Sequence, residues 1–344
     1  MPAGAIGDLS TMKALLSKQP GGPETLVLED VADPVPGARD VVIRVKACGV
    51  NYPDVLVIQD LYQFKPQRPF SPGGEVAGIV EAVGGSVTRL KAGDRVIGFA
   101  GSGGMAEKLL LGESRCLPMP KDMPFDVASG FLLTYGTSHH ALKDRAKLQA
   151  GETLLVLGAA GGVGLAAVEL GKAAGARVIA AVSNAEKAAL AKRHGADETV
   201  IYPTGPFDRP GQKALADLFK AAAGPQGADV IYDPVGGDFA EAALRAIAYE
   251  GRFLVVGFPA GIPKLPLNLT LLKSCQVIGV FWGDFVARNP AGNAANTRDL
   301  FAMWAAGTIK PEISARFPLA RGNEAIAMLA ARKALGKVIV TMES

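Results

Sequence analysis

Short runs rich in β-forming residues occupy the first third of the chain, and apolar and polar residues alternate clearly in one of them, VVIRVKA (41–47). The runs read TLVLEDV (25–31), VVIRVKACGV (41–50), GIVEAVG (78–84) and DRVIGF (94–99), and turns rich in glycine and proline separate them. An apolar residue at every second position is typical of an antiparallel strand with one buried face. Strands with this spacing predict a partly open β-barrel.

The pattern changes after residue 130, where short apolar runs begin to alternate with amphipathic segments of helical period. Strands are predicted at 153–158, 177–182, 199–202, 229–233, 252–257 and 276–281, and helices at 163–174, 185–194, 212–223 and 238–249. Gly175 and Gly195 stand where a glycine commonly ends a helix. Strands and helices in this order predict a doubly wound parallel sheet.

A glycine-rich turn, GAAGGVG (158–164), joins the first of these strands to the first helix. Glycines disfavour a continuous membrane-spanning helix here, but they allow backbone N–H groups at a helix N-terminus to approach a pyrophosphate. Gly164 would allow close packing of helix against sheet. A tight turn without a ligand is the alternative. The residues predicted to contact a dinucleotide are Gly158, Ala160, Gly161, Gly162 and Val163.

The end of the second strand bears on the choice between NAD and NADP. An NAD site usually has Asp or Glu there to bind the ribose 2′-hydroxyl. This chain has Ser183, and Lys187 follows closely. A hydroxyl and an ammonium favour a 2′-phosphate, and therefore NADPH. In the alternative interpretation, Ser183 caps the next helix and Lys187 is a solvated surface residue.

Composition excludes several classes of protein. The chain has 344 residues, enough for two domains, and its net charge of +3 is small and dispersed, so neither nucleic acid nor a membrane is expected as a partner. Its few, widely spaced cysteines, Cys48, Cys116 and Cys275, indicate reduced thiols and a cytoplasmic location. The N-terminus lacks the pattern of a signal peptide, and residues 1–11 are expected to be an extension before the patterned sequence.

Six segments occur in a characteristic order: GVNYPDVL, PFSPGGEVAGIVEAVG, KAGDRVIGF, GGMAEKLLL, GAAGGVGLAAVELGKAAGARVIA and DPVGGDFAEAALRAIAYEGRFLVVGF. Taken together and in this order, the segments resemble those of the zinc-free quinone oxidoreductase (zeta-crystallin-like) family of the medium-chain dehydrogenase/reductase superfamily. The resemblance extends from Met12 to Met342 and includes the terminal GKVIV. The resemblance implies an α/β fold with a GroES-like partly open β-barrel catalytic domain (1–133 and 286–344) and a Rossmann NADPH-binding domain (134–285). It also implies a homodimer formed through the Rossmann edge strand, expected at 276–282.

The resemblance also predicts that no metal is bound. Zinc-using relatives have a cysteine where this chain has Asn51 and a histidine where it has Gly74, and they carry a lobe of four cysteines that is absent here. Cys48 and Glu75 alone do not form the ligand set of tetrahedral zinc. Structural roles are expected for the three histidines, His139, His140 and His194.

By resemblance, Asn51 lies at the nicotinamide and the substrate carbonyl, and Thr134 contacts the nicotinamide carboxamide. An amide donor can stabilise negative charge that develops on a carbonyl oxygen. The alternatives are a turn residue for Asn51 and a helix-start hydroxyl for Thr134. Many relatives have a tyrosine where this chain has Leu56, so another hydroxyl is needed for proton donation. Of Tyr52 and Tyr62, Tyr62 is the better candidate.

The remaining expected cofactor contacts lie after the later strands, because ligands bind at the carboxyl ends of parallel strands. Tyr202 resembles the tyrosine that packs beside the 2′-phosphate, and Phe281 and Trp282 would flank the nicotinamide. These two aromatic residues and Phe285 are alternatively interface or core residues. The loop residues expected to pass the adenosine and nicotinamide ribose are Val235, Gly257 and Phe258.

The predicted function is NADPH-dependent, zinc-independent transfer of a hydride to a small-molecule quinone or α,β-unsaturated carbonyl compound, an activity of the EC 1.6.5 or 1.3.1 type. The cofactor carries the hydride chemistry, while the protein orients the reactants and excludes water. Two alternatives remain: an enoyl-thioester (enoyl-CoA) reductase, and an NADPH-binding structural or RNA-associated protein with little turnover.

Overall fold

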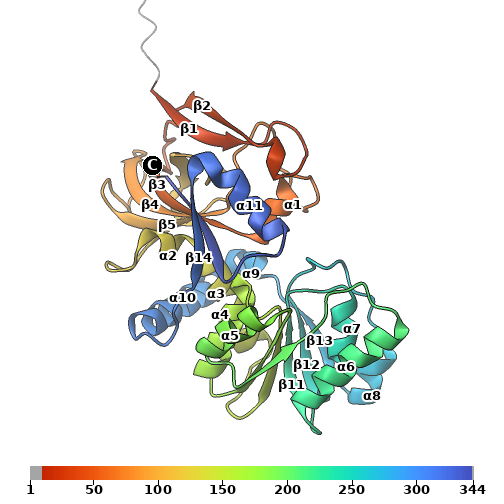
Figure 1. Ribbon diagram of the computed structural model, residues 1–344. Coiled ribbons are helices and arrows are strands. Elements are labelled where there is room, and N and C mark those ends of the chain that lie inside the picture. Colours follow the sequence, from red (N-terminus) through yellow and green to blue (C-terminus); the bar gives the residue numbers. More distant parts are fainter. Residues whose placement is uncertain (1–9, 343–344) are drawn as a thin grey trace, which may run out of the picture. The chain divides into compact units, whose positions relative to one another are not determined.

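The computed structural model describes residues 10–342 and consists of two compact units, coloured along the chain in Figure 1. The first runs to Phe131 and resumes at Ile313; the second spans Leu132–Glu312. The predicted second boundary, between residues 285 and 286, therefore moves to 312/313. It moves because helix α10 (Pro290–Ala305) packs against helix α3 (Leu132–His139) of the second unit. Of the predicted extension 1–11, residues 1–9 lie outside the described residues.

The first unit is built on a seven-stranded sheet of order β14-β15-β3-β4-β5-β7, in which β6 also pairs with β3. The four predicted strands are confirmed as β2 to β5, of which β2 pairs with β1 in a separate two-stranded sheet. The C-terminal segment completes the sheet, since β15 runs antiparallel to β3 with Val338 opposite Val50. The strands are β1 (Thr11–Leu16), β2 (Val27–Ala32), β3 (Asp40–Val50), β4 (Glu75–Val83), β5 (Arg95–Phe99), β6 (Lys108–Gly112), β7 (Cys116–Pro118), β14 (Ile313–Pro318) and β15 (Lys337–Thr341). The helices are η1 (Pro23–Thr25), α1 (Tyr52–Val57), η2 (Glu113–Arg115), α2 (Phe125–Ser129), η4 (Leu319–Arg321) and α11 (Gly322–Ala330).

The second unit contains a parallel six-stranded sheet of order β10-β9-β8-β11-β12-β13, which confirms all six predicted strands. The strands are β8 (Thr153–Leu157), β9 (Arg177–Val182), β10 (Glu198–Ile201), β11 (Ala228–Asp233), β12 (Ile247–Val255) and β13 (Gln276–Gly279). The remaining helices are the π-helix η3 (His140–Arg145), α4 (Gly162–Ala173), α5 (Ala185–Arg193), α6 (Arg209–Ala223), α7 (Asp238–Leu244), α8 (Asn268–Lys273) and α9 (Trp282–Arg288). The predicted helix 238–249 is too long: it ends at Leu244 because Ile247 already pairs with Ala228 in the sheet.

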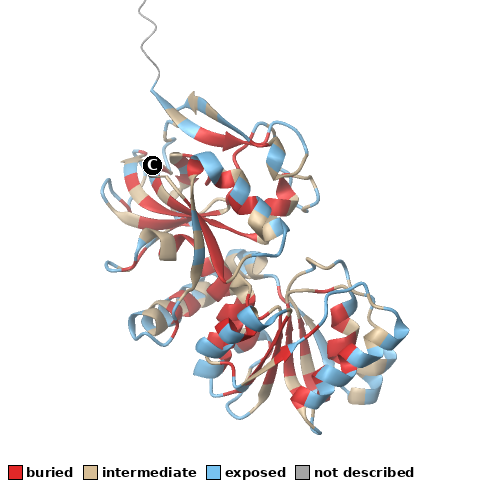
Figure 2. Ribbon diagram, in the orientation of Figure 1, coloured by how far each residue is buried: buried red, intermediate tan, exposed pale blue. Residues whose placement is uncertain are grey.

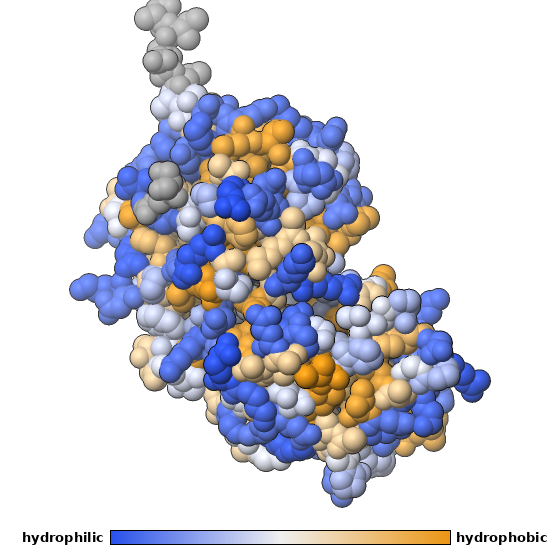
Figure 3. All heavy atoms as spheres, viewed as in Figure 1, coloured by the Kyte–Doolittle hydropathy of each residue, from blue (hydrophilic) through white to orange (hydrophobic). Residues whose placement is uncertain are grey.

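Each unit has its own hydrophobic core, visible as buried segments along the strands in Figure 2. Strand β8 is buried almost throughout, as expected of a central parallel strand covered by helices on both faces. The surface drawn in Figure 3 is mixed, with hydrophobic side chains gathered in small areas among hydrophilic ones. Among the described residues, no helix is both long and apolar enough to cross a membrane.

Candidate functional site

The glycine turn after β8 requires glycine at two of its positions, Gly158 and Gly164. Gly158 has φ +56°, a left-handed conformation that favours glycine. A Cβ atom on Gly164 would lie 2.3 Å from the Gly158 carbonyl oxygen, so helix α4 approaches the turn too closely for any other residue. A Cβ on Gly161, by contrast, would meet only the Gly158 oxygen, at 3.5 Å. The turn thus exposes backbone at the start of a twelve-residue helix.

This turn lies at the point where the strand order reverses, between β8 and β11. The two loops adjoin there, because a Cβ on Gly158 would lie 2.8 Å from Cγ2 of Val235. A crevice at such a switch point is the usual ligand site of a doubly wound sheet. The structure places six predicted cofactor residues within two residues of the carboxyl ends of their strands: Gly158, Ser183, Tyr202, Val235, Gly257 and Phe281.

Ser183 and Lys187 lie together at the end of β9. The Lys187 ammonium donates a hydrogen bond of 3.1 Å to the Ser183 hydroxyl. The residue that caps helix α5 is Asn184, whose side-chain oxygen accepts from the Lys187 backbone N–H at 2.9 Å. The alternative assignment of Ser183 as the helix cap is therefore wrong, and its hydroxyl pairs with Lys187 instead.

Two neighbouring loops are held by buried side chains. Tyr202 is buried and packs its ring against Phe219 and Phe239 in the core. Asp233, at the end of β11, was not singled out from the sequence, although it precedes a Pro-Val-Gly-Gly turn. Its Oδ1 accepts 2.8 Å hydrogen bonds from the backbone N–H groups of Val235 and Gly236, and burial raises its pKa to about 6. Asp233 therefore fixes the loop that faces Gly158.

The predicted nicotinamide residues of this unit lie on α3 and at the start of α9. Thr134 is buried within α3. A Cβ on Gly136 would lie 2.8 Å from the Trp282 indole, so the absence of a side chain there lets the indole rest on the helix. Phe281 is 60% exposed, whereas Phe285 stacks on His140 with ring centroids 3.9 Å apart. Trp282 and Phe285 thus make packing contacts, and Phe281 is available for a ligand or a partner.

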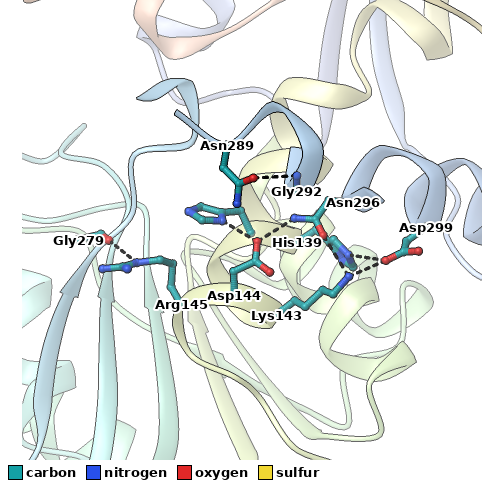
Figure 4. A network of polar contacts seen from close by, with 10 residues as sticks. His139, Lys143, Asp144, Arg145, Gly279, Asn289, Gly292, Asn296 and Asp299 are labelled. Carbon is teal, nitrogen blue, oxygen red and sulfur yellow. Dashed lines mark hydrogen bonds and ion pairs between the residues drawn. The ribbon is translucent and has the colours of Figure 1, made fainter. Parts of the chain in front are cut away.

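A polar network ties η3 to α10 (Figure 4). The Asp144 carboxylate accepts from Nδ2 of Asn296 at 2.8 Å and contacts Nδ1 of His140 at 2.7 Å. Lys143 bonds to both Asn296 and Asp299, and Arg145 donates to the Gly279 carbonyl at the end of β13. The network fastens the π-helix to its neighbours.

In the first unit, Asn51 lies in a buried polar cluster. Its Oδ1 accepts from the Lys337 ammonium at 2.6 Å, and its Nδ2 donates to the Gly49 carbonyl at 3.2 Å and to Oε2 of Glu75 at 3.3 Å. Only 7% of Asn51 is exposed. Both hydrogens of the amide already have acceptors, at long distances, so a substrate oxygen would have to share or replace one of them.

The carboxylates of the cluster have separate tasks. Asp54 accepts from the Asn51 backbone N–H at 2.8 Å and the Gly73 N–H at 3.0 Å, and burial raises its pKa to about 6. Burial also raises the pKa of the Cys48 thiol well above its usual value. Glu75 is wholly buried, 3.9 Å from the Lys337 ammonium.

Over residues 10–342, no group of three or more His, Cys, Asp or Glu side chains is arranged to hold a metal ion.

Tyr62 lies at the edge of the same core and is partly buried. Burial and the negative charge of Asp54 both raise the pKa of its hydroxyl. Like an ordinary tyrosine, Tyr62 is protonated at neutral pH and therefore has a proton to donate. Leu56, on α1, offers no such group.

Two family models match the chain. The alcohol dehydrogenase GroES-like domain matches residues 37–121, within the first unit, and the zinc-binding dehydrogenase model matches residues 162–296, within the second. Quinone oxidoreductase-like protein 2 from Bos taurus is 37% identical over 320 residues, which are 92% of this chain and 89% of that protein. Quinone oxidoreductase from Pseudomonas aeruginosa is 36% identical over 324 residues, 93% and 96% of the two chains. The chain belongs to the zinc-free quinone oxidoreductase family of the medium-chain dehydrogenase/reductase superfamily.

Solved structures of this family have the same fold. A mycobacterial protein complexed with NADPH superimposes with a TM-score of 0.88 at 32% identity, over 96% of this chain and 99% of that one. Escherichia coli quinone oxidoreductase complexed with NADPH gives 0.85 at 27% identity, with the same shares covered. These likenesses confirm the predicted fold class, a GroES-like domain joined to a Rossmann sheet.

Proposed function

We propose that the protein is an NADPH-dependent, zinc-independent reductase of quinones or α,β-unsaturated carbonyl compounds. The observation that carries the proposal is the Ser183–Lys187 pair at the carboxyl end of β9, next to the glycine turn. An ammonium and a hydroxyl suit a dianionic phosphate, whereas the carboxylate typical of an NAD site is absent from this position. Relatives that were solved with NADPH support the same choice of cofactor.

The second unit would hold the cofactor through backbone and side-chain groups of the switch point. Gly158, Gly161 and Gly162 would bind the pyrophosphate and Lys187 the 2′-phosphate, while Trp282 and Thr134 are proposed at the nicotinamide. NADPH, when bound, supplies the hydride. The chain's own task is then to place the acceptor and to stabilise the negative charge that develops on its carbonyl oxygen.

For that charge we propose Asn51 and Tyr62. The Asn51 amide oxygen accepts from Lys337, so only its nitrogen can donate to an acceptor, and it would do so by sharing or replacing its long hydrogen bonds to Gly49 and Glu75. Tyr62 would supply the proton that the reduced product requires. Neither group is a metal ligand, in keeping with a reductase that works without zinc.

The decisive experiment follows NADPH oxidation with a panel of acceptors: 1,2-naphthoquinone, simple enones and an enoyl-CoA, each with and without a chelator. Turnover with the first two that is insensitive to the chelator supports the proposal. A kcat/KM highest for the enoyl-CoA would favour the enoyl-thioester reductase instead. NADPH binding without turnover of any acceptor would leave only a binding protein.

Asn51→Ala tests how the charge is stabilised. Loss of one donor to a developing oxyanion should reduce kcat by roughly tenfold to a thousandfold, with a smaller change in KM and in NADPH affinity. Quinones accept electrons readily and should lose less than enones. A folded Asn51→Ala enzyme with full kcat for both acceptors would leave Asn51 as a turn residue only.

We also propose that the protein is a cytoplasmic homodimer that pairs through β13. This strand is an edge of the sheet, and Val277 on it is 42% exposed. In the adjoining segment Leu267, Leu271 and Leu272 are each more than 60% exposed. An unpaired edge beside exposed leucines is typical of an association surface.

A further inference from the structure

Lys337 is a buried lysine for which the sequence offered no role. It opens β15, in the terminal GKVIV segment, and is only 5% exposed. Buried lysines are rare unless they are paired, because removing an ammonium from water is costly. Its ammonium donates to the Val50 carbonyl at 3.0 Å and to Oδ1 of Asn51 at 2.6 Å. The second is shorter than the 3.2 and 3.3 Å hydrogen bonds that the Asn51 nitrogen donates.

The surrounding chain makes room for this side chain. A Cβ on Gly130 would lie 2.8 Å from Cε of Lys337, so a glycine at this position leaves the space that the lysine stem occupies. Strand β15 is paired with β3 so that Val338 stands opposite Val50, which brings Lys337 to the end of β3, where Asn51 follows. Side chains 286 residues apart in the sequence are thus joined by a hydrogen bond.

The partners of Asn51 determine which way its amide points. Lys337 can only donate, so it requires the amide oxygen on its side. The Gly49 carbonyl and the Glu75 carboxylate accept hydrogen bonds, so they require the amide nitrogen on theirs. A charged donor on the oxygen also polarises the amide and makes its N–H groups better donors.

We propose that Lys337 is a positioning residue that acts through Asn51: it fixes the amide oxygen and polarises the amide, so that an N–H group now held in a long hydrogen bond to Gly49 or Glu75 can donate to the developing charge of the acceptor. This inference rests on the proposed function. It predicts that Lys337 matters to kcat only while Asn51 is present.

The test is a double-mutant cycle of Lys337→Met and Asn51→Ala, with NADPH and an enone. Lys337→Met alone should lower kcat by about tenfold or more and change KM less, whereas in the Asn51→Ala background it should lower kcat by no more than about twofold. Lys337→Arg, which keeps a charged donor, should restore part of the loss. Lys108→Met is the matched control: Lys108 pairs with Asp33 and Glu81 in the same unit, and its loss should leave kcat unchanged.

A second readout does not depend on turnover. The side-chain amide resonances of Asn51, identified by their absence in Asn51→Ala, should shift and exchange faster with water in Lys337→Met, but not in Lys108→Met. Equal kcat losses in both backgrounds, or amide resonances that do not move, would overturn the proposal. If Lys337→Met does not fold, Lys337→Gln takes its place with the same outcomes. Wild-type protein that reduces no acceptor would overturn the proposed function, while the resonances still test the contact.

Discussion

Lys187 is the residue proposed to bind the 2′-phosphate of the cofactor at the end of β9. Its ammonium lies 3.1 Å from the Ser183 hydroxyl, and Asn184, not Ser183, caps the helix. The side chains of Ser183 and Lys187 therefore do not cap the helix, and both can contact a ligand. A single residue should therefore decide the preference for NADPH over NADH.

Lys187→Ala should weaken NADPH binding by about tenfold to a hundredfold, because a charge-assisted hydrogen bond contributes roughly 1.5–3 kcal/mol. NADH has no 2′-phosphate and should bind with unchanged affinity. Fluorescence titration with both cofactors measures the ratio. Lys192→Ala removes a lysine from the same helix, at its far end, and serves as the control. Equal weakening of both cofactors by Lys187→Ala would refute the assignment.

At the scale of elements, the contact between α4 and the glycine turn sets the shape of the cofactor site. Gly164 and Gly161 are both glycines of the same motif, yet only the first is closed in by backbone. A helix packed this closely cannot move away from one added methyl group without disturbing β8 and its neighbours. The two positions should therefore differ sharply in how well they tolerate an alanine side chain.

Gly164→Ala should destabilise the cofactor-free protein by about 1–3 kcal/mol, the usual cost of overpacking. For a domain of this size that lowers the melting temperature by roughly 2–4 °C per kcal/mol. Gly161→Ala should leave the melting temperature nearly unchanged, since its φ of −81° suits alanine. Calorimetry without cofactor compares them, and equal melting temperatures would contradict the packing argument.

A second contact between elements responds to pH. Glu169 of α4 contacts Nδ1 of His194 at 2.6 Å, accepts from the Tyr135 hydroxyl at 2.6 Å and from the Lys310 backbone N–H at 3.1 Å. Nε2 of His194 lies 3.3 Å from Glu312. The hydrogen bond to Glu169, more than any other cause, raises the pKa of His194.

A raised pKa in the folded state means that His194 stabilises the protein fully below about pH 6.5, its usual unfolded value, and that this contribution disappears as pH rises through the folded pKa. The stability advantage of the wild type over His194→Gln should therefore be largest near pH 5.5 and shrink toward pH 8.5. His139 is the opposite control: burial lowers its pKa, so its contribution is lost as pH falls. Free energies of unfolding, measured with denaturant at several pH values, test both expectations. A difference between wild type and His194→Gln that does not change with pH would exclude the effect.

At the scale of the whole molecule, association through β13 is open to a direct test. Val277→Asp places a charge on the exposed edge and should shift the protein from dimer to monomer in sedimentation velocity. Val35→Asp changes a valine that is 81% exposed in the first unit and should leave the dimer intact. A wild-type protein that sediments as a monomer at micromolar concentration would refute the proposed dimer.

The sequence by itself determined the parallel sheet and its glycine turn, because apolar periodicity and glycine spacing are local properties. All six strands after residue 150 were located, and Gly164 was correctly assigned to close packing. It also indicated that Ser183 and Lys187 could act together, since Ser183 directly follows β9 and Lys187 lies in the first turn of the next helix. Helix α7 was overestimated because its amphipathic pattern continues into β12.

Only the tertiary structure decided the partners of Asn51 and the boundary at 312/313. Lys337 reaches Asn51 through the pairing of β15 with β3, and such long-range register leaves no mark near either residue. The sequence near α10 likewise does not indicate its unit: α10 belongs to the second unit because it packs against α3. From the sequence, a lysine at the start of an apolar strand is expected to have a solvated ammonium group. Only the tertiary structure shows that the Lys337 side chain is buried against Gly130 and Asn51 and therefore belongs to the candidate site.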